Sequence, residues 1–260
     1  MLYGLKLLAL GAVTLPATLL TVIFGLFDAH GKYAYLISRF WSWLILAVGG
    51  VSLRVSGLNH IDPRRQYIFM VNHQSNLDIP VLFQSLPGFQ LRWLAKKEIL
   101  WVPFLGWAVW AARHIAVDRG DRKDALKSLK KAKERLAGGI SIVFFPEGTR
   151  SSDGGLLPFK RGGFLLAVKT QTPIVPVTIN GSGKILAKGD WRLRRGEIKV
   201  TVGMPLSVEG GGAKNLRALS TRVRDLIAAN LDSAEETTER KNHKAEPAVE
   251  THSSLKKRAV

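Results

Sequence analysis

The 260-residue sequence contains no cysteine, so it has neither disulfide bonds nor a thiol nucleophile. It also lacks a Gly-x-Ser-x-Gly turn, the segment that presents a nucleophilic serine in many hydrolases. No His-Glu-x-x-His pattern or other metal-site spacing occurs. We therefore expect no resident metal and no cofactor, and any nucleophile should come from a substrate.

Acidic residues are scarce, with 20 Asp and Glu against 38 Lys and Arg, which gives a formal net charge of +18. Residues 232–260 hold six residues of each sign, so the whole excess lies in residues 1–231. Such a basic body attracts nucleic acid, anionic lipids, phosphorylated substrates or an acidic carrier protein. No familiar nucleic-acid-binding motif occurs. We therefore expect anionic membrane lipids rather than nucleic acid as partners.

Long apolar runs are confined to the N-terminus, from Leu2 to Phe27 and from Tyr33 to Val51. As a helix the first run would reach ~39 Å, enough to cross a bilayer. The second is interrupted by Arg39 and rich in aromatic residues, which suits a membrane interface. A cleavable signal peptide is the alternative, but the apolar part is too long and lacks a clear cleavage site. Two helices that insert together, as a hairpin or within one leaflet, fit best.

The remaining pattern predicts an α/β fold, with a mixed, mostly parallel sheet flanked by helices. We expect residues 1–55 to form the membrane-associating helices, 56–231 the α/β domain, and 232–260 a disordered polar tail. The segment Trp93–Trp110 reads as a packed helix–turn–helix or as a contact for a membrane or an acyl chain. The segment Trp191–Val202 reads as a hairpin at a sheet edge. The predicted strands are Tyr67–Val71, Ile140–Phe145 and Ile174–Ile179, and the predicted helices are Arg122–Leu136, Phe164–Lys169 and Asn215–Leu231.

His73 and Asp78 follow the first of these strands, five residues apart. In a regular helix five residues rotate about 500°, which leaves the two side chains about 140° apart. The pair can therefore meet only if the segment turns, as a loop that runs into a helix with Asn76 or Asp78 near its N-terminus and Pro80 in its first turn. A histidine oriented by a carboxylate can take a proton from an alcohol.

A second polar segment, Phe145-Pro146-Glu147-Gly148-Thr149-Arg150-Ser151, follows the strand at Ile140–Phe145. Gly148 permits close approach of the backbone, Arg150 offers a planar fork of donors, and Thr149 adds a hydroxyl, all of which suit a phosphate. Ligands of open α/β sheets bind beyond the carboxyl ends of strands. Both polar segments are thus expected to face one crevice, with Glu147 as an ion-pair partner that positions Arg150 in preference to a direct catalytic role.

Together these residues resemble the H-x-x-x-x-D and F-P-E-G-T-R-S blocks of the 1-acylglycerol-3-phosphate O-acyltransferases, the lysophosphatidate acyltransferase family. Gly106 with Ile115–Arg119 resembles the second family block, and Ile174–Ile179 resembles the fourth. Four blocks in order across residues 67–180 make the resemblance specific. It implies transfer of an acyl group from acyl-coenzyme A or acyl carrier protein to the sn-2 hydroxyl of lysophosphatidate, which gives phosphatidate.

The resemblance also implies roles for individual residues. His73 and Asp78 would be catalytic, and Arg119 and Arg150 would hold the acceptor phosphate in a pocket shaped by Glu147, Gly148 and Thr149. Lys96 is a candidate for the oxyanion or donor side, and Pro176 is linked to the donor side. The expected location is a membrane, for a bacterium the inner membrane with the catalytic domain on its cytoplasmic side. A related acyltransferase that uses another lyso-lipid or an acylated amine stays open, and a membrane scaffold is disfavoured because His73 and Asp78 are both present.

Overall fold

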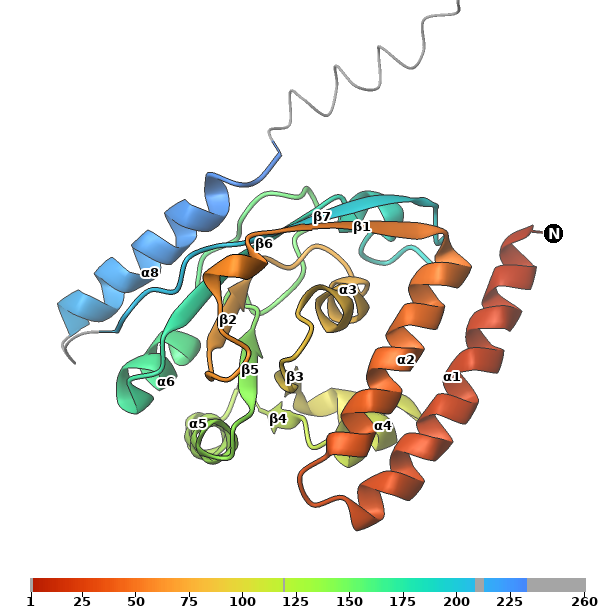
Figure 1. Cartoon of the computed structure of the whole chain (residues 1–260), viewed down its shortest axis with the longest axis horizontal. Coiled ribbons are helices and arrows are strands. Elements are labelled where there is room, and N and C mark those ends of the chain that lie inside the picture. The colour runs from red at the N-terminus through yellow and green to blue at the C-terminus, as the bar shows by residue number, and fades with distance from the viewer. Residues whose placement is uncertain (1, 119, 209–212, 233–260) are drawn as a thin grey trace, which may run out of the picture. The chain divides into compact units, whose positions relative to one another are not determined.

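A seven-stranded sheet forms the centre of the protein, in the order β1-β7-β6-β2-β5-β3-β4 (Figure 1). The computed structural model describes residues 2–118, 120–208 and 213–232, and the described residues up to Asn230 form one compact unit. Among the described strands, β6 and β7 are the single antiparallel pair, so the predicted mixed, mostly parallel sheet is confirmed. The strands are β1 Val51–Ser56, β2 Ile68–Val71, β3 Leu91–Lys96, β4 Ile115–Val117, β5 Ser141–Phe144, β6 Ile174–Asn180 and β7 Gly196–Val202.

Helices cover both faces of this sheet. One face packs against α2 and α3, and the other against α5, α6 and α8, so the core has two apolar layers. Each residue of β2 is buried, with Phe69 and Val71 in the first layer and Ile68 and Met70 in the second, as expected for a parallel strand covered on both sides. The helices are α1 Leu2–Phe27, α2 Lys32–Gly49, η1 Leu58–His60, α3 Asp78–Ser85, η2 Lys97–Trp101, α4 Leu105–Ala111, α5 Arg122–Ala137, α6 Gly162–Thr170, α7 Ser182–Ile185 and α8 Ala213–Ala228.

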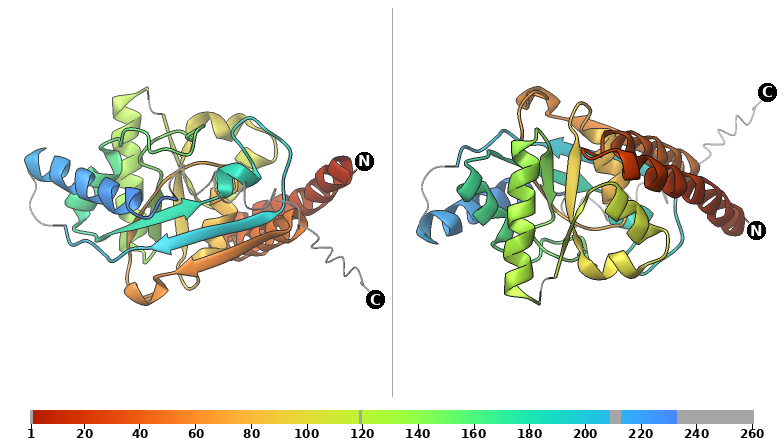
Figure 2. Two further views of the ribbon diagram at one scale, coloured as in Figure 1. Left: turned by 90° about the horizontal axis from the view of Figure 1, so that it is seen from above. Right: turned by 90° about the horizontal axis from the view of Figure 1, so that it is seen from below.

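The two N-terminal helices, α1 and α2, form an antiparallel hairpin, which agrees with the two helices expected there (Figure 2). The turn between them uses Gly31 at φ +66° and Asp28, whose carboxylate accepts a 2.7 Å hydrogen bond from the Tyr33 backbone N–H. Within α1, Gly4–Phe27 is long and apolar enough to cross a membrane. The boundary predicted after residue 55 falls inside β1. This strand pairs in parallel with β7 and so belongs to the sheet. The tail predicted to be disordered lies, from residue 233 on, outside the described residues.

A buried arginine, Arg92 on β3, joins the hairpin to the sheet. Its guanidinium donates to the backbone carbonyls of His30 at 2.8 Å and Gly31 at 3.0 Å, and also to Leu91 O. Burial, followed by the charge of Arg135, lowers the pKa of Arg92 to about 10. Both contacts of Arg92 with the turn are to backbone carbonyls, so they do not depend on the side chain of His30.

Two segments differ from their predicted structure. The segment Trp93–Trp110 is not a helix–turn–helix: it begins within β3 and continues through η2 into α4. Its apolar residues face a cavity or solvent rather than one helix interface, which explains the missing helical period. The segment Trp191–Val202 is not a hairpin, because only its second half forms a strand, β7, which pairs with β6 and β1.

Candidate active site

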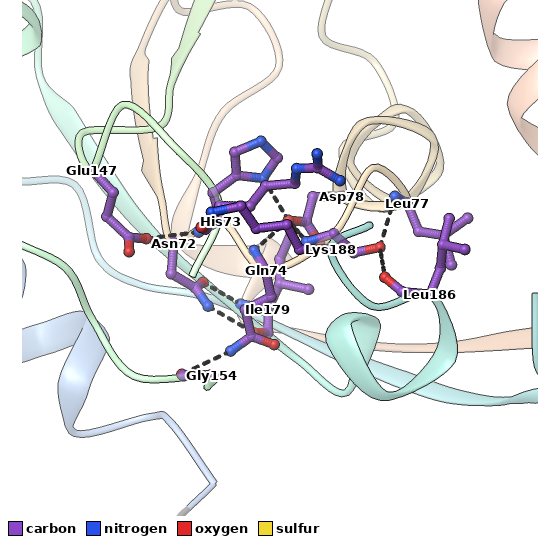
Figure 3. Close-up of polar contacts among 12 residues, drawn as sticks. Asn72, His73, Gln74, Leu77, Asp78, Glu147, Gly154, Ile179, Leu186 and Lys188 are labelled. Carbon is purple, nitrogen blue, oxygen red and sulfur yellow. Dashed lines mark hydrogen bonds and ion pairs between the residues drawn. The ribbon is translucent and has the colours of Figure 1, made fainter. Parts of the chain in front are cut away.

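The loop that carries His73 leaves β2 at Asn72, which is buried. The side chain of Asn72 accepts from the Ile179 N–H at 2.7 Å and donates to the Ile179 carbonyl at 2.9 Å (Figure 3). The Asn72 amide thus makes the two hydrogen bonds to β6 that a backbone residue would make if β2 continued. This pairing fixes the point at which the chain turns away from the sheet, one residue before His73.

Asp78 is the first residue of α3 and is fully buried, and its Oδ2 atom lies 2.7 Å from Nδ1 of His73. The same oxygen accepts backbone N–H bonds from Gln74 at 2.8 Å and Ser75 at 2.9 Å. The loop therefore wraps around one carboxylate oxygen. The predicted turn is confirmed, with Pro80 in the first turn of α3.

The contact with Asp78 determines which nitrogen of His73 can act as a base. A carboxylate only accepts hydrogen bonds, so Nδ1 carries the proton, and Nε2 keeps its lone pair in the neutral ring. The side chain of His73 is 16% exposed, so a substrate can reach it. The pair has the geometry of a general base with its orienting group.

The segment after β5 holds His73 from its other side. The imidazole stacks on the Phe145 ring with centroids 3.9 Å apart. The backbone N–H of His73 donates to Glu147 Oε1 at 2.8 Å, and its carbonyl accepts from Ser151 N–H at 2.8 Å. The structure thus brings together the two polar segments that the sequence placed in one crevice.

Glu147 does not pair with Arg150 as predicted. Its carboxylate is buried and accepts from two backbone N–H groups, those of His73 and of Leu157 at 2.9 Å, and no ion pair joins it to Arg150 in the described part of the chain. Burial raises the pKa of Glu147, while these two N–H donors act in the opposite direction. Glu147 therefore ties the His73 loop to residue 157.

The loop at Gly148 lies against basic side chains. Gly148 has φ +74°, a conformation that favours glycine, and a Cβ atom there would lie 2.9 Å from the Lys160 amine, so the missing side chain leaves room for this lysine beside the loop. Lys188 donates to the Arg150 carbonyl at 3.0 Å (Figure 3). Thr149 is exposed and Arg150 half-buried. Lys188 was not expected at this site, because nothing in its local sequence distinguishes it from the other exposed lysines.

Other predicted site residues lie on different strands. Lys96 ends β3 at the carboxyl edge of the sheet and pairs with Glu98 at 2.8 Å. Pro176 lies inside β6 opposite Met70, the next-to-last residue of β2. Arg119 lies outside the described residues, two positions after β4. Among described residues, no group of three or more His, Asp or Glu is placed to hold a metal ion.

A cavity of about 340 Å³ lies between the hairpin, α3, β3 and α4. Asn76 and Ile79, next to the His73 loop, form part of its wall, and so does His114, whose pKa burial lowers to about 3, so that the ring is neutral. The sequence reading missed the contribution of α1, although Thr14, Thr18 and Thr21 recur at helical spacing within an apolar run. The lining residues are Thr14, Ala17, Thr18, Thr21, Ser38, Trp41, Asn76, Ile79, Phe83, Trp93, Ala95, Ile99, Leu105, Ala108, Val109, Ala112 and His114.

Residues 52–180 match a family model described as acyltransferase. The chain is 34% identical over 226 residues to the 1-acyl-sn-glycerol-3-phosphate acyltransferase of Pseudomonas aeruginosa, covering 85% of each chain. It is 38% identical over 176 residues to human 1-acyl-sn-glycerol-3-phosphate acyltransferase alpha; this covers 67% of the chain but only 62% of the human protein. The crystal structure of a 1-acyl-sn-glycerophosphate acyltransferase, PlsC, from Thermotoga maritima superimposes with a TM-score of 0.69 at 25% identity, over 95% of this chain and all of that one.

Proposed function

Because the chain belongs to the 1-acyl-sn-glycerol-3-phosphate acyltransferase family, we propose that it moves an acyl group from a thioester to the sn-2 hydroxyl of lysophosphatidate. The product would be phosphatidate. The observation that carries the proposal is the 2.7 Å contact between His73 Nδ1 and Asp78 Oδ2, which leaves Nε2 of His73 available as a base. The curated relative from Pseudomonas aeruginosa carries the name of this activity.

In this mechanism the acceptor hydroxyl attacks directly. Nε2 of His73 takes the hydroxyl proton while the oxygen forms a bond to the thioester carbonyl carbon. Collapse of the tetrahedral intermediate breaks the carbon–sulfur bond, and the imidazolium returns the proton to the departing thiolate. Asp78 stabilises the imidazolium that exists between these steps and keeps the ring in place. No protein nucleophile and no cofactor enters the cycle.

The acceptor phosphate would bind beside Gly148. Lys160 lies against this glycine and Arg150 follows two residues later, and we expect both cations to contact the phosphate. Arg119 is proposed as a third cation from its match to the family block. Glu147 contributes indirectly, because it fixes the His73 backbone to the same loop. Thr149 is exposed and adds a hydroxyl at the rim.

The acyl chain of the donor would occupy the cavity between the hairpin and β3, whose wall includes Asn76 and Ile79 of the catalytic segment. α1 would enter the bilayer, which holds the acceptor. The family resemblance suggests the cytoplasmic side of a bacterial inner membrane. Acyl-coenzyme A and acyl carrier protein are both acidic and suit the net charge of +18. Lys96 remains our candidate for stabilising the thioester oxygen, whereas Pro176, inside β6, would act only through the sheet.

The test is a competition among acceptors with a labelled acyl thioester and the purified full chain. Lysophosphatidate should be used about tenfold or more faster than lysophosphatidylcholine or lysophosphatidylethanolamine, because two cations prefer a phosphate monoester. Arg150→Ala should raise the KM for lysophosphatidate and leave the donor KM nearly unchanged. Arg222→Ala, an exposed arginine on α8, is the matched control.

Equal use of the zwitterionic acceptors would contradict the phosphate assignment. So would an Arg150→Ala defect confined to the donor KM. Either result would favour an acyltransferase that uses another lyso-lipid or an acylated amine.

A further inference from the structure

Six large apolar side chains between residues 101 and 110 point into solvent. They are exposed from 45% to 83%, with Trp101 the most exposed. We call these residues the aromatic patch: Trp101, Val102, Phe104, Leu105, Trp107 and Trp110. An exposed apolar patch of this density marks a surface that meets another apolar phase.

One residue of the aromatic patch, Phe104, has a strained backbone conformation. Phe104 has φ +64° and ψ −53°, a conformation that a bulky L-residue rarely adopts. This residue lets η2 turn into α4, and its ring packs edge-on against Trp107 with centroids 5.3 Å apart. Strain of this kind persists where the surrounding fold imposes it and is common at functional surfaces.

The aromatic patch is continuous with the hairpin. α4 packs against the end of α1 so closely that a Cβ atom on Gly25 would lie 2.8 Å from the Cβ of Ala111. Arg113 donates to the Gly25 carbonyl at 2.9 Å, and its guanidinium lies 5.5 Å from the Trp110 ring centroid. On α1 itself, Ile23, Phe24, Leu26 and Phe27 are exposed beside this contact. A bilayer that receives this end of α1 therefore meets α4 as well.

Charge distinguishes the partner. The lysines that precede the patch are paired, Lys96 with Glu98 at 2.8 Å and Lys97 with Asp118 at 3.9 Å. An acidic carrier protein would need unpaired cations there, whereas the interfacial zone of a bilayer favours tryptophan and tolerates a neutral rim.

We propose that the aromatic patch is a second membrane-contact surface, carried by the catalytic domain itself, which inserts into the interfacial zone of the bilayer beside the helical hairpin. It rests on the proposed membrane role of α1, and it adds that α4 fixes the depth and rotation of the catalytic sheet at the lipid surface. A contact on α4 as well as on the hairpin prevents the domain from swinging about a single anchor.

The experiment uses the full chain and vesicles of phosphatidylcholine alone, so that charge attraction is minimal. The double variant Trp101→Ser with Trp107→Ser should lower the vesicle partition coefficient by about tenfold. The matched control is Leu126→Ser with Leu226→Ser, two exposed leucines on α5 and α8, which should partition like the wild type. Acyl transfer to a short-chain, water-soluble lysophosphatidate should persist in both, which separates failure of the patch from failure of the proposed function.

A second readout protects against misfolding of the double variant. Trp101→Phe is mild at so exposed a position, and it should reduce the fraction of tryptophan fluorescence that brominated phosphatidylcholine quenches. Unchanged partition of the double variant, or an unchanged quenched fraction in Trp101→Phe, would overturn the proposal. So would a lipid-free dimer that Trp101→Ser dissociates while vesicle binding stays intact, because the patch would then join two copies of the chain.

Discussion

The loop around His73 and the turn of the helical hairpin are both fixed by hydrogen bonds to backbone, but the arginine that reaches the turn from β3 has the opposite polarity to the carboxylates at the loop. At the catalytic loop, the carboxylates of Asp78 and Glu147 accept from backbone N–H groups and so shape the chain around a base. At the hairpin turn, the guanidinium of Arg92 donates to backbone carbonyls. The first arrangement orients the side chain of His73, and the second attaches the helical hairpin to the sheet. Substitutions in the loop should therefore lower kcat, and substitutions at the turn should lower the free energy of unfolding.

The largest effect should follow from His73→Ala. Loss of the base should lower kcat by about a thousandfold or more while the fold persists, because Asp78 keeps its hydrogen bonds from the Gln74 and Ser75 N–H groups when the ring is removed. The measurement is acyl transfer by purified protein whose unfolding transition matches the wild type. His30→Ala, an exposed histidine at the hairpin turn, is the control and should keep full activity.

Asp78→Asn should have the next largest effect, about a hundredfold in kcat. An amide retains the shape, and its oxygen can accept the same three hydrogen bonds, but it carries no negative charge to stabilise the imidazolium that His73 forms. The KM values for both substrates should change little. A variant with wild-type kcat would show that the ring needs no carboxylate.

Arg92→Met should act on the other side of the comparison. Three carbonyl contacts disappear from a buried position, so the free energy of unfolding should fall by about 2 kcal/mol. Gln90→Ala is the matched control, since Gln90 donates to the same His30 carbonyl from an exposed position and should cost much less. Denaturant titration measures both, and equal losses would show that the buried arginine has no special part in holding the hairpin.

The smallest effect concerns Glu147 and pH. Because burial raises the pKa of Glu147 above its ordinary 4.5, the folded protein binds that proton more tightly than the unfolded chain does. The stability that this proton contributes is therefore lost as the pH rises from 4.5 through the raised pKa. Glu147→Gln should unfold with a shallower pH dependence in that window, as measured by denaturant titration at several pH values. Superimposable pH dependences would contradict the assignment.

The sequence predicted the parts of the fold that local pattern controls. Continuous apolar runs correctly predicted β2, β5 and β6, and the spacing of His73 and Asp78 required the turn that precedes α3. The sequence did not predict β3, Leu91–Lys96. Trp93 on this strand lines a cavity whose other wall comes from α1, and such a contact between distant segments leaves no periodic pattern in the local sequence. The prediction that Glu147 pairs with Arg150 was wrong for a similar reason, since the N–H groups of His73 and Leu157 reach Glu147 only in the folded chain.

In the proposed mechanism a substrate hydroxyl, deprotonated by His73, attacks the thioester directly. Rapid quenching of the protein with a stoichiometric labelled acyl thioester, with and without lysophosphatidate, tests it most directly. We predict that the label passes to phosphatidate only when acceptor is present, that no label remains on the protein, and that His73→Ala forms no product. Stoichiometric labelling of the protein in the absence of acceptor would contradict the account.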